Sequence, residues 1–153
     1  MKIAVVHGPN LNLLGRREPE IYGRATLADI DRVLTETGRE DGVEVVCLQS
    51  NSEGVLIDEV QRLGPNVDGL IVNAGGYSHT SIALLDALVG IGRPYVEVHL
   101  SNVMAREPFR HHSLLAGRAL GAIMGFGADS YVLGLRGLVS YLRARDRAAV
   151  NLK

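Results

Sequence analysis

The chain has 153 residues, 46% of them hydrophobic, which is enough apolar material for one domain with a single core. Its formal net charge of -1 arises from 16 basic and 17 acidic residues without a basic run, so no nucleic acid or membrane partner is expected and a small soluble molecule is favoured. The one cysteine, Cys47, excludes an internal disulfide and a cysteine-based metal site, and we expect it to be a small buried hydrophobe.

In chain order, short apolar runs alternate with segments of helical periodicity. Strands are expected at residues 2 to 6, 43 to 49, 69 to 73, 94 to 99 and 121 to 126. The first expected helix carries an apolar stripe of Leu27, Ile30, Val33 and Leu34. The second, with Ser52 as its expected N-cap, carries Val55, Ile57, Val60 and Leu63. A third is expected over 78–90, and a last from about 129 to 147.

Apolar strands that alternate with helices are typical of a parallel sheet covered on both faces. The pattern therefore predicts the α/β class, with a flavodoxin-like doubly wound sheet of five parallel strands and helices on both faces. We expect one domain over residues 1–153. Only about five apolar residues precede His7, too few for a signal-peptide core or a membrane span, so we expect a cytoplasmic protein.

Polar residues at the carboxyl ends of the strands are the first candidates for a site, because ligands of open α/β sheets bind there. The first strand runs into HGPN (7–10) and the third into NAGG (73–76). The fourth runs into Glu97, His99 and then Ser101. In a flavodoxin-like strand order these ends are neighbours, so the sequence predicts one polar crevice built from distant segments.

Two features of this edge have both a structural and a functional interpretation. Glu97 and His99 lie two residues apart on one strand face. They are either a structural histidine with its carboxylate or a proton shuttle whose tautomer and basicity the carboxylate sets. The segment NAGGYSH (73–79) is either a turn with a helix cap or a backbone cradle for an anion.

Signals for a cofactor are weak. GFGADS (125–130) lacks the last glycine of a dinucleotide-binding loop, and no Walker-type phosphate loop is present. The adjacent His111 and His112 stay unassigned because neighbouring helical residues point apart. The only lysines, Lys2 and Lys153, lie near the termini, which nearly excludes a Schiff base. Any carbonyl chemistry must therefore proceed through an enol or enolate.

Four motifs follow one another along the chain: GPNLNLLGRREPEIYG (8–23), NAGGYSHTS (73–81), EVHLSN (97–102) and REPFRHHS (106–113). Together they resemble type II 3-dehydroquinate dehydratase, in the order and spacing of that family, over about residues 3 to 142. The resemblance implies a flavodoxin-like lyase of the shikimate pathway, which leads to aromatic amino acids. It would eliminate water in the trans sense from 3-dehydroquinate, through an enolate, to give 3-dehydroshikimate. The resemblance also implies no metal or organic cofactor and a homo-oligomer, a dodecamer built as a tetramer of trimers.

The resemblance assigns catalytic roles to five residues by position. Tyr22 would be the base that removes a proton from the carbon next to the ketone, with Arg17 as its activator. His99, held by Glu97, would protonate the departing hydroxyl. Asn10 would help to hold a water that stabilises the enolate.

The resemblance also assigns the residues that bind the substrate carboxylate. Asn73, Ser101 and the backbone amide of Leu100 would take this group. Arg106 would be a further lining residue.

The ring hydroxyls of the substrate have their own implied partners. His79 and Arg110 would hold them, assisted by Asp86 from a neighbouring subunit. The chain departs from the family at Met104, where histidine is frequent, and at Ser78, where threonine is usual. These departures put only the fine tuning of affinity in doubt.

The charged segment LLGRREPEIYG (13–23) has a solvated charge cluster as its simplest interpretation. A functional one follows from Tyr22, because a free phenol with a pKa near 10 is a poor base and the guanidinium of Arg17 favours the phenolate. Lowering that pKa by about 2 corresponds to roughly 2.7 kcal/mol. Pro19 keeps Glu18 out of helical geometry, so we expect a loop that closes over the crevice as a lid.

Two other function classes rank below a dehydratase. A module that binds FMN or a nucleotide needs a phosphate-cradling loop after the first strand, where this chain has Pro9 without a backbone donor. A receiver-type signalling domain needs acidic residues at that strand end and an aspartate after the third strand. This chain has His7 and Asn73 there.

Overall fold

A sheet of five parallel strands lies at the centre of the computed structural model, which describes residues 1–15 and 25–150. The strands are β1 Lys2–His7, β2 Glu44–Gln49, β3 Gly69–Asn73, β4 Tyr95–His99 and β5 Gly121–Met124. Their order is β2-β1-β3-β4-β5, and all four pairings are parallel. The predicted flavodoxin-like sheet is confirmed, with its switch point between β1 and β3.

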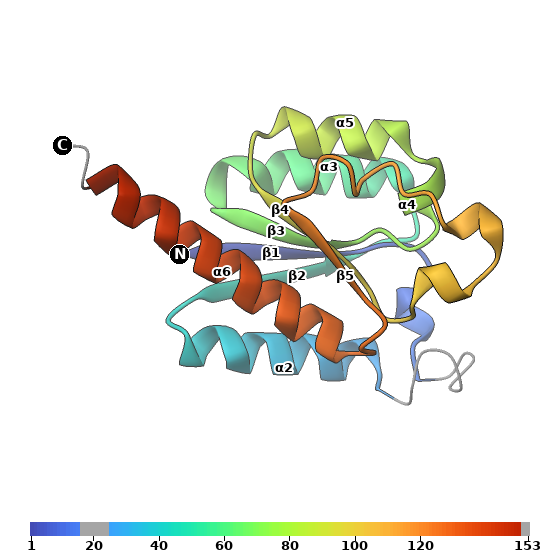
Figure 1. Ribbon diagram of the computed structural model, residues 1–153, viewed down its shortest axis with the longest axis horizontal. Coiled ribbons are helices and arrows are strands. Elements are labelled where there is room, and N and C mark those ends of the chain that lie inside the picture. Colours follow the sequence, from blue (N-terminus) through green and yellow to red (C-terminus); the bar gives the residue numbers. More distant parts are fainter. Residues whose placement is uncertain (16–24, 151–153) are drawn as a thin grey trace.

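Helices cover both faces of the sheet (Figure 1). On one face lie α3 (Glu53–Leu63) and α5 (Ile82–Gly90), and on the other lie α2 (Leu27–Glu40) and α6 (Asp129–Val150). Short helices complete the loops: η1 Leu11–Leu13, η2 Gly64–Asn66, α4 Tyr77–Thr80, η3 Val103–Ala105 and η4 Pro108–Arg110.

The core consists of two clusters, one on each face of the sheet. Ile3 and Val5 of β1 belong to the cluster beneath α2 and α6, whereas Ala4 and Val6 of the same strand belong to the cluster beneath α3 and α5. Successive side chains of a strand point to opposite faces, so a strand covered on both sides is apolar throughout. This is why the central strands β1 and β3 were recognisable as almost continuous apolar runs.

The helix boundaries follow local capping chemistry. Ser52 caps α3 as predicted, since its side chain accepts a hydrogen bond from the backbone N–H of Val55. The helix predicted over 78–90 is divided, because Ser81 adopts an extended conformation and caps α5 by accepting a hydrogen bond from the N–H of Leu84. The prediction of one continuous helix there was therefore wrong.

Two residues of the predicted apolar stripes do not face the core. Val33 of α2 is 37% exposed and Val55 of α3 is 47% exposed. In α3 the buried face is formed by Leu56, Val60 and Leu63 instead. Among the described residues, no helix has the length and apolar character needed to cross a bilayer.

Candidate active site

A crevice of about 230 Å³ opens at the carboxyl ends of β1, β3 and β4, where the sequence predicted it. Most of the residues assigned by resemblance line it: Asn10, Asn73, His79, His99, Leu100, Ser101, Arg106 and Arg110. The parallel sheet explains this convergence, because all its strands end at the same edge and β3 lies between β1 and β4.

His99 is held by a buried carboxylate on its own strand. Its Nε2 lies 2.7 Å from Oε1 of Glu97, and the Glu97 side chain is almost fully buried. The hydroxyl of Ser113 donates to both oxygens of Glu97, at 2.8 and 2.9 Å. An ionised carboxylate only accepts, so Nε2 of His99 carries a hydrogen and Nδ1 is the ring nitrogen left for a ligand.

The ring of His79 lies parallel to that of His99, with centroids 6.4 Å apart and an interplanar angle of 8°. Its Nδ1 lies 2.8 Å from the backbone carbonyl of His112. Because a carbonyl only accepts, Nδ1 is the donor, and Nε2 of a neutral imidazole is left as an acceptor for a ligand hydroxyl. His112, unassigned from the sequence, thus contributes through its backbone.

The carboxamide of Asn73 is fixed from two sides at the end of β3. Its Nδ2 donates to the hydroxyl of Tyr131 at 3.0 Å, and its Oδ1 accepts from the N–H of Gly75 at 3.2 Å. The side chain of Asn73 is therefore oriented, with one Nδ2 hydrogen left over for a ligand in the crevice.

The rim of the crevice carries two guanidinium groups beside one glutamate. Nε of Arg110 lies 2.8 Å and Nε of Arg106 lies 3.6 Å from Oε2 of Glu107. Its own backbone N–H, then the hydrogen bond from Arg110, hold the pKa of Glu107 below its ordinary value. Two cations that share one carboxylate leave this rim with a positive balance, which suits an anionic ligand.

Asn10 follows β1 in a left-handed backbone conformation, with φ of 67°. Among the described residues, it is the one non-glycine with a positive φ. Its backbone N–H donates to Oδ1 of Asn51 at 2.9 Å, which holds the turn. Such a conformation is uncommon outside glycine and clusters at functional sites, in agreement with the place of Asn10 in the crevice.

The other assigned residues are of three kinds. Glu97 is buried and contacts the crevice through its hydrogen bond with His99. Arg17 and Tyr22, with the rest of the predicted lid at 16–24, lie outside the described residues. Asp86 on α5 lines a separate groove beside α3, together with Ile57 and Gln61.

Two functional contacts were missed from the sequence. Ser113 ends the motif REPFRHHS, which was its one signal, and Tyr131 of α6 carried none, since both act through contacts between distant segments. The two departures from the family are placed as follows: Met104 is 54% exposed, and Ser78 is buried with no hydrogen-bond partner for its Oγ in the described part of the chain.

Taken together, the crevice offers an imidazole backed by a carboxylate, a fixed carboxamide donor and two rim arginines. This set can move a proton on a small anionic molecule that also carries hydroxyl groups.

Comparison with known proteins finds a family profile and relatives that match most of the chain. The family profile described as Dehydroquinase class II matches residues 1–139. The 3-dehydroquinate dehydratase of Rhodopseudomonas palustris (strain TIE-1) is 59% identical over 147 residues, which cover 95% of this chain and 97% of that protein. The 3-dehydroquinate dehydratase of Synechococcus sp. (strain CC9902) is 57% identical over 143 residues, covering 94% and 98%.

Solved structures agree with the sequences. The crystal structure of the type II dehydroquinase from Butyrivibrio crossotus DSM 2876 superposes with a TM-score of 0.88 at 41% identity, and the match covers 90% of this chain and 97% of that one.

Proposed function

This chain belongs to the class II dehydroquinases, and on that premise we propose how its residues divide the dehydration of 3-dehydroquinate. The reaction is a hydro-lyase step of the shikimate pathway: 3-dehydroquinate loses water and 3-dehydroshikimate forms. Membership of this family removes the FMN-binding and receiver-domain alternatives.

The acid and the base act in sequence on the substrate. The phenolate of Tyr22, favoured by the charge of Arg17, takes the proton from the carbon next to the ketone, and the electron pair enters an enolate. His99 then gives its Nδ1 proton to the departing hydroxyl, which leaves as water while the double bond forms. Solvent carries the proton on Tyr22 back to His99, so the enzyme ends each turnover as it began.

The observation that carries this proposal is the contact of His99 with Glu97 at 2.7 Å, backed by Ser113. The buried carboxylate holds the imidazole through Nε2 and leaves Nδ1 for the substrate, the orientation that a general acid requires. Asn10 holds the water that stabilises the enolate oxygen.

Binding uses the remaining residues of the crevice. The free Nδ2 hydrogen of Asn73, the hydroxyl of Ser101 and the amide of Leu100 take the substrate carboxylate. Arg106 lines the site beside them.

Two further side chains hold the ring hydroxyls. Nε2 of His79 accepts a hydrogen bond from one of them, and Arg110 donates to another.

We also propose that the protein is a homo-oligomer, a dodecamer built as a tetramer of trimers. The outward face of α5 supports this, since Ile82 is 63% and Val89 is 37% exposed and Asp86 lies on the same helix in a groove away from the crevice. In the trimer, Asp86 reaches the ring-hydroxyl side of a neighbour's site. The cytoplasmic location expected from the sequence stays a prediction.

The test is an absorbance assay for the conjugated enone formed when the purified protein meets 3-dehydroquinate. The wild-type protein is expected to be active, and His99→Asn and Tyr22→Phe are each expected to lose about 100-fold to 10,000-fold in kcat, the usual contribution of an acid or a base. His112→Ala is the matched control, because His112 contributes its backbone carbonyl and its side chain is exposed. Near wild-type turnover in His99→Asn would overturn the assignment of the acid.

A further inference from the structure

A chain of hydrogen-bonded side chains runs through the core behind the crevice. Oδ1 of Asp31 on α2 lies 2.9 Å from Nε2 of His7, at the end of β1. Nδ1 of His7 lies 2.8 Å from the hydroxyl of Tyr131 on α6, which accepts from Asn73 at 3.0 Å. His7 and Tyr131 are fully buried, and of these four residues only Asn73 lines the crevice.

One assignment of hydrogens satisfies every contact in this chain. Burial alone would raise the pKa of Asp31, but its contacts with His7 and Cys47 hold that pKa below its ordinary value, so Asp31 is the acceptor. Nε2 of His7 is then the donor, and Nδ1 accepts the hydroxyl hydrogen of Tyr131. Burial raises the pKa of Tyr131, so this hydrogen stays on the phenol, and its oxygen is free to accept from Nδ2 of Asn73.

Asp31, at one end of this series of hydrogen-bonded side chains, lies at a surface groove. The groove is lined by Asp31, Cys47 and the polar face of α2, including Arg32. Cys47 packs against the core cluster on this face, as the predicted small hydrophobe would, but it is only half-buried. The ligand atoms of His7, Asp31 and Cys47 lie within 4.8 Å of one another, and two of them are already joined by the hydrogen bond between His7 and Asp31.

The direction of the hydrogen bonds determines which end of the Asn73 carboxamide faces Tyr131. A flipped carboxamide would set its oxygen against the Tyr131 oxygen, whose hydrogen is committed to His7, and its NH₂ group against the N–H of Gly75. Both contacts would be repulsive in a buried site, where unmade hydrogen bonds are costly. The unflipped form keeps one Nδ2 hydrogen available in the crevice.

We propose that Tyr131, His7 and Asp31 are positioning residues that hold the Asn73 carboxamide as a donor to the substrate carboxylate. The inference rests on the proposed role of Asn73 in binding that carboxylate. The carboxylate is bonded to the carbon that loses the hydroxyl, but its own charge and bonds do not change in the reaction, so its binding contributes to the ground state and the transition state alike. Loss of the positioning therefore raises KM and leaves kcat nearly unchanged.

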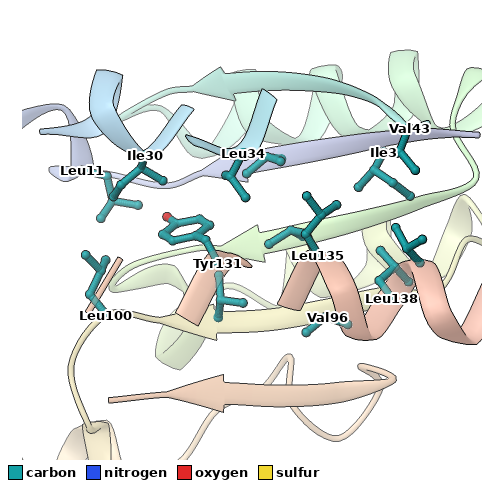
Figure 2. Close-up of a cluster of buried hydrophobic side chains, with 14 of the residues drawn as sticks. Ile3, Leu11, Ile30, Leu34, Val43, Val96, Leu100, Tyr131, Leu135 and Leu138 are labelled. Carbon is teal, nitrogen blue, oxygen red and sulfur yellow. The ribbon is translucent and has the colours of Figure 1, made fainter. Parts of the chain in front are cut away.

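The hydroxyl of Tyr131 can be separated from its packing role. Its ring belongs to the core cluster that includes Ile30, Leu34 and Leu100. In Figure 2 its oxygen points toward the end of the cluster where Leu11 is drawn, and Leu11 also lines the crevice. Tyr131→Phe keeps the ring and removes only the hydroxyl. Tyr141→Phe, on the same helix at a 42% exposed position, is the matched control.

Steady-state kinetics of the full oligomeric enzyme tests the proposal. Tyr131→Phe is expected to raise KM for 3-dehydroquinate roughly tenfold to hundredfold, with kcat within about threefold of wild type. Asn73→Ala is expected to raise KM at least as much. The double variant is expected to match Asn73→Ala alone, because Tyr131 acts through Asn73 and the two effects are not additive. Tyr141→Phe is expected to change neither constant.

The outcomes separate the two hypotheses. If Asn73→Ala leaves KM unchanged, the proposed binding role of Asn73 is wrong. If Asn73→Ala raises KM but Tyr131→Phe does not, or if the two effects add in the double variant, the positioning role is overturned. A fall in kcat at constant KM in Tyr131→Phe would also overturn it.

A measurement on the wild-type enzyme keeps the proposal testable if Tyr131→Phe does not fold. Long-range ¹H–¹⁵N correlation spectra are expected to show His7 as the tautomer with its hydrogen on Nε2. A hydrogen on Nδ1 would reverse the contact with Tyr131 and contradict the proposal.

Discussion

The hydroxyl of Ser113 joins the loop after η4 to the carboxylate behind His99. It donates to Glu97 and accepts from the backbone N–H groups of Leu115 and Ala116, both at 3.1 Å. A single oxygen thus ties the position of the carboxylate to that of the loop.

Ser113→Ala is expected to lower kcat by about tenfold, because a hydrogen bond to a charged group contributes about 1.5 to 3 kcal/mol and its loss frees Glu97 to move away from His99. The enone assay measures the rate, and circular dichroism checks the fold. Ser113→Thr retains the hydroxyl and is expected to recover most of the rate. Equal losses in the two variants would show that the effect comes from the loop and not from the hydrogen bond.

Asp31 makes stability depend on pH. Burial alone would raise its pKa, but contacts with His7 and Cys47 lower it in the folded state. Asp31 therefore stabilises the fold above its unfolded pKa of about 4, and this contribution is lost as the pH falls through the lower folded value. Asp31→Asn is therefore expected to be less stable than wild type at pH 7, with the difference shrinking below about pH 4. Urea unfolding from pH 7 to pH 3 measures this. A difference that is constant over the range would contradict it.

Individual site residues could be predicted from the sequence where their contact depends on local spacing. Glu97 and His99 are two apart on a strand, and this alone predicts that they share a face. Tyr131 and His7 are 124 positions apart, and only the packing of α6 across the sheet brings them together. An isolated tyrosine in a helical stretch gives no sign of such a contact.

The last helix, α6, approaches the sheet closely because one of its residues has no side chain. A Cβ added to Gly134 would lie 2.9 Å from Cγ1 of Val98 on β4. Gly137, three residues later, has open space at the same position. Alanine substitutions at these two glycines therefore distinguish the effect of packing on stability from the effect of helix propensity.

Gly134→Ala is expected to lower the free energy of unfolding by about 1 to 2 kcal/mol, because overpacking outweighs the gain in helix propensity. Gly137→Ala, where only propensity changes, is expected to raise it by about 0.5 to 1 kcal/mol. Urea titrations of both variants measure the effect. Stabilisation by Gly134→Ala would mean that α6 does not pack tightly on β4.

Secondary-structure elements were easiest to predict where both of their faces are buried. The central strands β1 and β3 are covered on both faces, so their apolar runs are almost continuous and β3 was predicted to the residue. The helices were less certain, because an apolar side chain such as Val55 also occurs at an exposed position and the break at Ser81 depends on one side-chain hydrogen bond. Hydrophobic periodicity predicts neither the exposure of Val55 nor the break at Ser81.

The proposed assembly of the whole molecule depends on Asp86 of α5. Asp86 lies apart from the crevice of its own subunit, on a helix whose exposed apolar residues suit a contact between copies.

Asp86→Ala is expected to raise KM roughly tenfold and to leave kcat at saturation nearly unchanged, since the base and the acid are on other segments. Asp146→Ala, at a 67% exposed side chain near the end of α6, removes the same charge and is expected to change neither constant. Size-exclusion chromatography with activity measured across the peak checks the assembly. A fully active monomer of 16.5 kDa would contradict the shared site.

The hydrogen bond between His7 and Tyr131 also has a consequence for the order of events during synthesis. The two residues are 124 positions apart, and at about 5 to 20 residues per second the ribosome needs roughly 6 to 25 s to pass from one to the other. A nascent chain that has already made β1, β3 and β4 holds the imidazole and its carboxylate, but its Asn73 has no phenol to orient it. On this proposal, the donor to the substrate carboxylate is oriented only when the last helix leaves the ribosomal tunnel and docks, so a chain stalled before that point lacks both this helix in its core and the oriented Asn73 carboxamide.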